Sequence, residues 1–139
     1  MNKKTPISKI MTTDVVTLNK SDSLNTAEML FKTHKIRHIP VVDEDVLLGM
    51  LSYTDLLRIS FADAAFEDEE TIDTVVYNMF TIEQVMVKKL VSASSKTTIR
   101  EVASILAKKD FHALPIVDDD KLSGIVTTTD LLNFLLQQY

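Results

Sequence analysis

The sequence has no cysteine, and its 139 residues include only two glycines and three prolines. Without cysteine the chain cannot form disulfides, thiolate-ligated metal sites or a thiol nucleophile. Nothing therefore ties the chain to an oxidising compartment, and we expect a cytoplasmic location. Two glycines also exclude a glycine-rich phosphate loop of the Walker type.

Long hydrophobic runs are equally scarce. The stretch DLLNFLLQQY, residues 130–139, is far shorter than the roughly 20 apolar residues of a membrane-spanning helix. The N-terminus, MNKKTPISKIM, has lysines but lacks the apolar segment of a signal peptide. We therefore expect a protein that is neither secreted nor membrane-spanning.

The charge balance limits the class of partner. A formal net charge of −5 argues against a broad nucleic-acid surface, because phosphate backbones are bound mainly by excess lysine and arginine. Binding of a small anion in a local basic pocket remains compatible with this net charge. The 45% apolar and 25% charged composition is typical of a soluble globular domain.

The sequence repeats itself after 75 residues without insertion or deletion. The two glycines, Gly49 and Gly124, have this spacing. The same spacing relates other identical pairs: Pro40 and Pro115, Ile7 and Ile82, Met11 and Met86, Asp43 and Asp118, Leu47 and Leu122, Thr54 and Thr129, and Asp55 and Asp130. The chain is therefore a tandem duplication, and we place the repeats at residues 1–60 and 82–139.

Each repeat has the pattern of a β-α-β-β-α unit. Apolar residues at helical spacing predict a helix in the middle of each copy, at Leu24, Ala27, Leu30 and Phe31 and again at Ile99, Val102, Ile105 and Leu106. Two apolar runs around an acidic turn, within 38–52 and 113–127, predict a hairpin. A short helical turn and an extended segment precede this core, and a helix opening with TDLL follows it. The predicted fold class is α/β (α+β).

One such unit of about 55 residues buries little apolar surface, so we expect the two copies to pack through their sheets. The segment between them, residues 61–81, is predicted to be an acidic, amphipathic helical linker. Its apolar stripe consists of Ile72, Val75, Val76, Met79 and Phe80. The stripe indicates a helix that covers the core or forms a dimer seam, and a dedicated partner groove is the alternative.

The duplicated phrases HIPVVDEDVLLGMLSYTDLL and ALPIVDDDKLSGIVTTTDLL resemble the tandem cystathionine-β-synthase (CBS) domain. The resemblance extends from about residue 7 to residue 135. It implies a pseudo-two-fold pair of repeats, a Bateman-type module, that regulates other proteins by binding AMP, ADP or ATP, or sometimes S-adenosylmethionine, in clefts between the repeats. It leaves the regulated protein open.

The repeated Ser/Thr-x-x-Asp motif suits such a ligand chemically. Helix starts favour anions, hydroxyls can donate to phosphate, and an aspartate can accept both hydroxyls of a ribose diol. The resemblance assigns ribose to Asp55 and Asp130. It assigns phosphate to Ser52, Thr54, Thr127 and Thr129, together with Arg37, His38 and His112. A helix-capping box is the competing interpretation of the same motif, and both roles can coexist.

The resemblance also implies two adenine pockets. One would combine Thr12, Val16, Ile36 and Ile39 with Asp130, and the other Val87, Val91, Phe111 and Leu114 with Asp55. We expect the two sites to differ, because Ala113 and Asp110 replace His38 and Lys35 in the second copy. His34 and His38 have helical metal spacing, but Pro40 follows closely and no third ligand is evident, so no metal is predicted.

No catalytic constellation is evident in the sequence, and no cofactor is required by it. The chain is therefore predicted to be a non-enzymatic nucleotide-sensing module. The alternative is a structural dimerisation or interaction module with vacant or decayed sites. Because a CBS pair exposes apolar helix faces, we also expect a homodimer.

Overall fold

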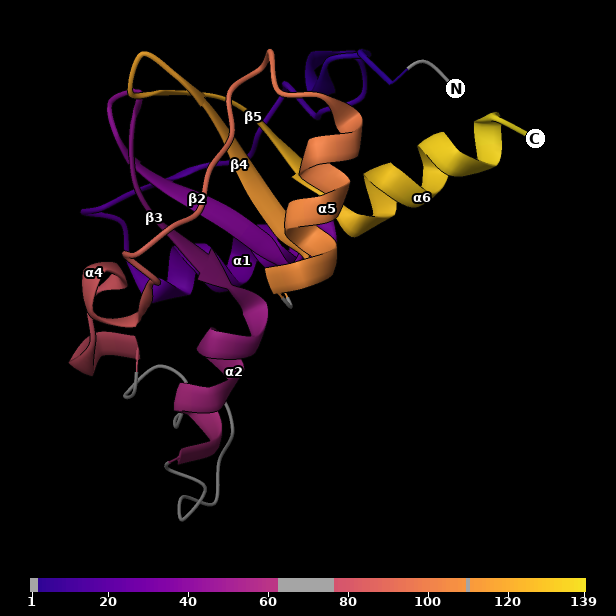
Figure 1. Cartoon of the computed structure of the whole chain (residues 1–139). Coiled ribbons are helices and arrows are strands. Elements are labelled where there is room, and N and C mark those ends of the chain that lie inside the picture. The colour runs from indigo at the N-terminus through magenta and orange to yellow at the C-terminus, as the bar shows by residue number, and fades with distance from the viewer. Residues whose placement is uncertain (1–2, 63–76, 110) are drawn as a thin grey trace. The chain divides into compact units, whose positions relative to one another are not determined.

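Two β-hairpins form the framework of the computed structural model, which describes residues 3–62, 77–109 and 111–139. Strand β2 (His38–Asp43) pairs antiparallel with β3 (Val46–Ser52), and β4 (Ala113–Asp118) pairs antiparallel with β5 (Lys121–Thr127) (Figure 1). Both hairpins have a register shift at the corresponding place, after Val41 and after Ile116. The predicted hairpins are therefore confirmed in both repeats.

The acidic residues between the strands form tight two-residue turns. Glu44, Asp119 and Asp120 have positive φ angles of 57°, 51° and 66°. Two-residue hairpin turns favour such left-handed conformations because they match the right-handed twist of the strands. Aspartate tolerates this region better than most residues do, which explains why the second turn needs no glycine.

The helices of each repeat flank its hairpin along the chain. Helix α1 (Leu24–His34) and helix α5 (Ile99–Lys109) precede the hairpins, and helix α2 (Tyr53–Ala62) and helix α6 (Thr128–Gln137) follow them. Ser23 caps α1 by accepting a hydrogen bond from the Thr26 N–H. The buried residues have helical spacing: Leu24, Ala27 and Phe31 in α1, and Ile99, Val102 and Leu106 in α5. The predicted mixed α and β fold is confirmed.

The first strand differs between the repeats. Strand β1 (Leu18–Asn19) pairs parallel with β2, whereas the second repeat has only a single bridge at the corresponding place, between Ala93 and Ile116. The predicted opening strand is thus wrong for the second copy. Ala93 replaces the buried Leu18 there, and alanine is among the residues depleted in strands.

The structure divides into two compact units that do not coincide with the sequence repeats. Unit 1 combines Met1–Val15 with Val91–Tyr139, and unit 2 is Val16–Leu90. In unit 1, the short helix η1 (Ile7–Lys9) is held by the Ile7 N–H, which donates to the Thr97 carbonyl at 2.7 Å. Unit 2 likewise contains α4 (Ile82–Val85), the start of the second repeat. Each unit therefore completes itself with the first segment of the other repeat.

Each unit has its own hydrophobic core. The core of unit 2 includes Leu18, Phe31, Ile39, Leu51 and Leu56, together with Ile82 and Met86 from the start of the second repeat. The core of unit 1 includes Val102, Leu114, Ile116 and Val126, together with Ile7 from the start of the first repeat. The borrowed segment in each unit therefore contributes buried apolar surface as well as hydrogen bonds.

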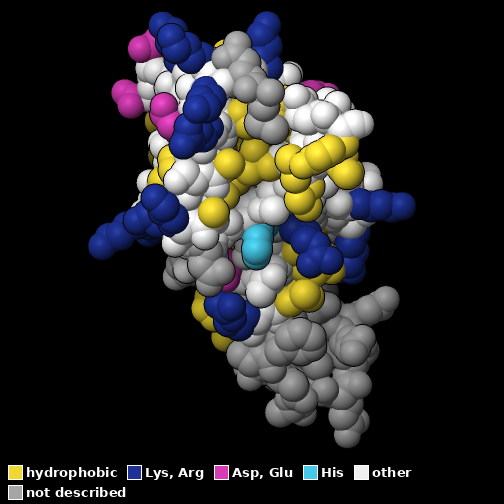
Figure 2. Space-filling view, turned by 45° about the vertical axis from the view of Figure 1, so that its right-hand side comes forward, with side chains coloured by type: hydrophobic (Ala, Val, Ile, Leu, Met, Phe, Trp, Pro, Cys, Tyr) yellow, Lys and Arg dark blue, Asp and Glu magenta, His cyan; other side chains and the backbone are white. Residues whose placement is uncertain are grey.

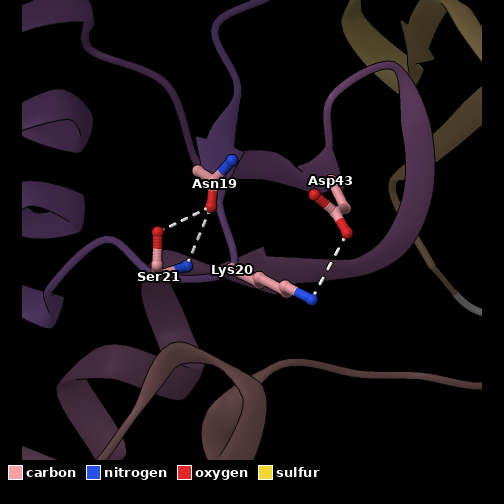
Figure 3. A network of polar contacts seen from close by, with 4 residues as sticks. All are labelled: Asn19, Lys20, Ser21 and Asp43. Atoms are coloured by element: carbon pink, nitrogen blue, oxygen red, sulfur yellow. Dashed lines mark hydrogen bonds and ion pairs between the residues drawn. The ribbon is translucent and has the colours of Figure 1, made fainter.

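The aspartate that ends the apolar-Pro-apolar-apolar-Asp run has a structural role in both units. Asp43 pairs with Lys20 at 3.3 Å beside the Asn19–Ser21 turn (Figure 3). Asp118 accepts hydrogen bonds from the Ser123 hydroxyl at 2.6 Å and the Ser95 N–H at 3.1 Å. These hydrogen bonds, with that from Ser123 the strongest, lower the pKa of Asp118 below its usual range. The sequence identified Asp43 and Asp118 as an identical pair at the 75-residue spacing but did not indicate these contacts.

Both glycines lie where a neighbouring backbone crosses the hairpin. The Met50 and Val87 backbones exchange two hydrogen bonds beside Gly49, and the Thr12 and Ile125 backbones do the same beside Gly124. A Cβ at Gly49 would lie 2.8 Å from the Val87 carbonyl oxygen, and one at Gly124 would lie 2.7 Å from the Thr12 carbonyl oxygen. Such a contact with backbone cannot be relieved by rotating a side chain, so a hydrogen is required at both positions.

We predict that Gly49→Ala and Gly124→Ala each lower the free energy of unfolding by about 1–3 kcal/mol, the usual cost of overpacking. Val46→Ala and Lys121→Ala are matched controls, because both are exposed residues of the same two strands. Chemical denaturation of the four variants measures the effect. Glycine variants that are no less stable than these controls would contradict the steric explanation.

Candidate functional site

The start of helix α2 brings together the residues that were predicted to bind phosphate and ribose in unit 2. Ser52 ends β3, and its hydroxyl accepts a hydrogen bond from the Asp55 N–H at 3.0 Å. The Asp55 carboxylate accepts from Arg58, with 3.3 Å between Oδ1 and Nη1. Thr54 lies between them and is exposed. A hydroxyl, a carboxylate and a guanidinium therefore lie within one helical turn.

The start of helix α6 has the corresponding arrangement in unit 1 and forms a complete capping box. The Asp130 N–H donates to the Thr127 hydroxyl at 3.2 Å, and the Asp130 Oδ2 accepts from the Thr127 N–H at 2.9 Å. The competing interpretation of the motif is thus confirmed for its folding role, with aspartate in the position usually taken by Glu or Gln. This role occupies one carboxylate oxygen, so it does not exclude a ligand on the other.

The two helix starts differ in the partner of the aspartate. Asp55 pairs with Arg58, whereas position 133, the counterpart of Arg58, is an asparagine. The Asp55 carboxylate is consequently partly neutralised by a guanidinium, and the Asp130 carboxylate is held by a backbone N–H instead. Sequence comparison of the repeats could have found this difference, because Arg58 and Asn133 have the 75-residue spacing.

The predicted basic residues lie beside the same helix starts. The Tyr53 N–H, in the first turn of α2, donates to the Arg37 carbonyl at 2.8 Å, and the Thr128 N–H of α6 donates to the His112 carbonyl at 2.9 Å. His38 is the register partner of Ser52 at the end of the hairpin. Arg37 and His112 are exposed, and His38 is half-buried. In each unit, an arginine or histidine side chain therefore lies beside the end of the strand, β3 or β5, that leads into the helix.

These contacts change how an anion could be held. Tyr53 and Asp55 in α2, and Thr128 and Asp130 in α6, use their backbone N–H groups within the protein. Fewer unpaired N–H groups are left at these helix starts than the sequence suggested. The exposed hydroxyls of Thr54 and Thr129 and the nearby basic side chains are consequently the better phosphate donors.

The residues predicted to line the adenine pockets are distributed over both units. Thr12 belongs to unit 1 with Asp130, and Val87 belongs to unit 2 with Asp55. The other predicted members lie in the unit opposite to their aspartate, so the assembly of each complete pocket stays a prediction: Val16, Ile36 and Ile39 in unit 2, and Val91, Phe111 and Leu114 in unit 1.

The exposure of these residues divides them into two groups. Val87 and Val91 are 48% and 40% exposed, and Val16, Ile36 and Phe111 are half-buried. Ile39 and Leu114 are completely buried in the cores of their units. These two residues are core residues of strands β2 and β4. Direct contact between either of them and a ligand stays a prediction.

Other sequence predictions can be placed only in part. Asp110 and residues Ile72, Val75 and Val76 of the apolar stripe lie outside the described residues. Of the stripe, Met79 and Phe80 are described and are 65% and 39% exposed. His34 ends α1 and His38 begins β2, with Lys35 between them in the left-handed conformation. The two histidines therefore do not share a helix.

Within residues 3–62, 77–109 and 111–139, no helix has the length and apolar character that crossing a bilayer requires. The same residues contain no cluster of three or more His, Asp or Glu side chains suited to a metal ion.

The family model of the CBS domain matches the chain twice, at residues 7–62 and 82–137. Because the two matches cover most of the chain, the protein belongs to the CBS domain family. The matched segments follow the sequence repeats. The compact units do not, because residues 1–15 of the first repeat belong to unit 1 and the start of the second repeat, up to Leu90, belongs to unit 2.

Relatives and solved structures agree with this assignment. The CBS domain-containing protein YhcV of Bacillus subtilis is 32% identical over 121 residues, which cover 87% of this chain and 79% of YhcV. MJ1225 of Methanocaldococcus jannaschii is 26% identical over 129 residues, 92% of this chain and 46% of MJ1225, so the chain spans about half of that relative. The crystal structure of MJ1225 superposes with a TM-score of 0.83 over 97% of this chain and 49% of that one. The structure of CBSX2 in complex with AMP is 24% identical and superposes with a TM-score of 0.79 over 96% and 98% of the two chains.

Proposed function

We propose that this protein is a regulatory module that binds an adenosyl ligand, with AMP, ADP or ATP as the preferred class. The observation that carries the proposal is the duplicated cluster of hydroxyl, carboxylate and basic groups at the starts of α2 and α6. Such a cluster offers acceptors for a ribose diol and donors for phosphate within one helical turn. The AMP complex of CBSX2, a protein of the same fold, supports this ligand class.

In this proposal Asp55 and Asp130 accept hydrogen bonds from ribose hydroxyls. Ser52 and Thr54 in unit 2, and Thr127 and Thr129 in unit 1, face the phosphates. Arg37 and His38 in unit 2, and His112 in unit 1, supply donors that compensate the phosphate charge. The module acts without catalysing a reaction and requires no cofactor, and the ligand changes how it contacts a regulated protein.

A second candidate function has its own observation. The Thr127–Asp130 capping box shows that the motif stabilises a helix by itself, so a structural dimerisation module with vacant sites would retain the same residues. S-adenosylmethionine is a further candidate ligand, because it carries the same ribose without phosphate. We also propose that the protein is a homodimer and is cytoplasmic. The homodimer follows from exposed apolar residues such as Leu132 and Leu136, and the cytoplasmic location from the absence of cysteine.

The first functional prediction is that AMP, ADP or ATP raises the melting temperature of the protein. A ligand that binds only the folded state at roughly 100 times its dissociation constant adds about 2.7 kcal/mol to stability. Differential scanning fluorimetry with millimolar nucleotide, and with S-adenosylmethionine in parallel, measures the shift. No shift with any of these ligands would favour the structural module.

The second functional prediction separates the capping role of the aspartates from the binding role. Asp55→Asn and Asp130→Asn should leave the melting temperature of the unliganded protein nearly unchanged, because the asparagine amide oxygen can still accept the hydrogen bonds from Arg58 and from the Thr127 N–H. Each variant should weaken one binding event by roughly ten- to a hundredfold, because a hydrogen bond to a charged group contributes about 1.5–3 kcal/mol. The double variant should no longer bind ribonucleotides.

Isothermal titration calorimetry measures this effect, and Asp120→Asn is the matched control because it removes one charge in the β4–β5 turn. We expect the two sites to bind the nucleotide with unequal affinities, or only one site per chain to be occupied. Asp55 pairs with Arg58 whereas Asp130 has no arginine partner, and Ala113 takes the place of His38 in the second repeat. Unaltered affinity in a folded double variant would assign both aspartates to capping alone.

A further inference from the structure

The segment that crosses each hairpin brings a third group of side chains to the candidate site of the same unit. In unit 2, Val87 exchanges two backbone hydrogen bonds with Met50, two residues before β3 ends at Ser52. In unit 1, Thr12 makes the same exchange with Ile125, two residues before β5 ends. Each site therefore combines three segments of one unit: the crossing segment, the start of β2 or β4, and the helix start.

These three segments can be compared position by position, because the repeats align without a gap. They are residues 36–39, 52–58 and 87–90 in unit 2, and residues 111–114, 127–133 and 12–15 in unit 1. At every position where a charged or imidazole side chain is exchanged, unit 2 has the more basic residue: Arg37 for His112, His38 for Ala113, Arg58 for Asn133, Lys88 for Thr13, and Lys89 for Asp14.

The resulting charges of the two sites have opposite signs. The three segments of unit 2 contain four lysine or arginine residues and one aspartate, whereas those of unit 1 contain two aspartates and neither lysine nor arginine. The chain as a whole carries a formal net charge of −5. Figure 2 shows lysine and arginine side chains exposed on one face of this acidic molecule, so its net charge does not describe every part of its surface. The basic excess at the unit 2 site is local.

The lysines of the crossing segment lie near enough to the helix start to attract a phosphate there. Lys88 and Lys89 are exposed and follow Val87 directly, and Val87 pairs with Met50 roughly 7 Å along the strand from Ser52. An exposed charge acts over about 8–10 Å at ordinary ionic strength. An ammonium group on a flexible lysine stem therefore attracts a phosphate chain without having to contact its first phosphate.

Arg58 is a second source of positive charge at the unit 2 site. Its Nη1 atom lies 3.3 Å from Asp55 Oδ1, and its side chain is 75% exposed. A guanidinium has five N–H donors in a planar fork, and the ion pair with Asp55 engages Nη1. The same guanidinium can therefore hold the Asp55 carboxylate and donate to a phosphate oxygen.

The unit 1 site has the opposite character. Asp14 is exposed on its crossing segment, at the position of Lys89, and Asn133 provides no charge at the position of Arg58. His112 is the only basic residue in the three segments of this unit. A carboxylate beside the site repels a long phosphate chain, and one imidazole can compensate a single phosphate.

We propose that the two sites divide the adenosine phosphates between them, so that the unit 2 site selects ATP and the unit 1 site selects AMP. Lys88, Lys89 and Arg58 determine the preference of unit 2 for a longer phosphate chain, and Asp14 excludes such a chain from unit 1. This inference rests on the proposed adenosyl function and adds which nucleotide each site takes.

Single-site variants make each preference measurable by isothermal titration calorimetry in buffer without divalent cations. Asp130→Asn weakens the unit 1 site and leaves the unit 2 site, which should bind ATP at least roughly tenfold more tightly than AMP, as expected from additional hydrogen bonds to charged groups. Asp55→Asn leaves the unit 1 site, which should prefer AMP. Raising the ionic strength should narrow the preference of unit 2, because exposed charges are screened by salt.

Exchange of the crossing-segment residues tests their role directly. In the Asp130→Asn background, Lys88→Thr with Lys89→Asp installs the unit 1 residues and should lower the ATP affinity by at least roughly tenfold, with a much smaller effect on AMP. A matched control with the same change in charge is Lys96→Thr with Lys121→Asp. Both of these lysines are exposed and lie at the opposite end of the β4–β5 hairpin from the α6 start.

The reciprocal exchange gives a gain of binding that misfolding cannot produce. In the Asp55→Asn background, Thr13→Lys with Asp14→Lys should raise the ATP affinity of the unit 1 site by at least roughly tenfold. Unchanged ATP affinity in both exchanges, or an equal loss in the control pair, would overturn this inference and leave the proposed function intact. Failure of the unaltered chain to bind any adenosyl ligand would overturn both.

Discussion

The close approach of two backbones at Gly49 and at Gly124 is the constraint on which the rest of the structure depends. At each glycine a segment from the other repeat crosses the hairpin and exchanges two backbone hydrogen bonds with it, through Val87 in unit 2 and Thr12 in unit 1. The crossing segment also brings Ile82 or Ile7 into the core. Because each repeat completes the other unit, neither repeat contains a full core by itself. The same strands continue directly into the helix starts that carry Asp55 and Asp130.

Much of this organisation could be predicted from the sequence, because it is local or periodic. The 75-residue spacing, the hairpins around acidic turns and the helix after Ser23 depend on patterns within one repeat. The exchange of the first segments could not be predicted in this way, because it depends on tertiary contacts that leave no periodic signal. The single bridge at Ala93 was not predicted, because the repeat pattern suggested the same strand in both copies although Ala93 replaces the buried Leu18. At the candidate site the residue types were evident, but the Asp55–Arg58 pair and the hydrogen bonds that occupy Tyr53 and Thr128 required the structure.

The two units have diverged from a common arrangement in the charged groups that they carry. Unit 2 keeps charged groups at the corresponding positions, with Arg58 beside Asp55 and the Glu28–Lys32 pair on α1. Unit 1 has a capping box at Thr127 and Asp130 without an arginine partner, and Ala103 and Ala107 stand where unit 2 has Glu28 and Lys32. The two helix starts therefore differ in the charge that they would present to a ligand. Helix α6 carries Asp130 in its first turn, and several of its apolar residues line a groove between α5 and α6.

The central claim is that the aspartates at the helix starts hold the ribose of an adenosyl ligand. The most direct measurement is a calorimetric comparison of AMP with its 2′,3′-dideoxy analogue, which keeps the adenine and the phosphate but lacks both hydroxyls. The account predicts that the analogue binds at least roughly tenfold more weakly, because each carboxylate loses charge-assisted hydrogen bonds of about 1.5–3 kcal/mol. Equal affinities for the two nucleotides would contradict the claim and would leave Asp55 and Asp130 with their capping role alone.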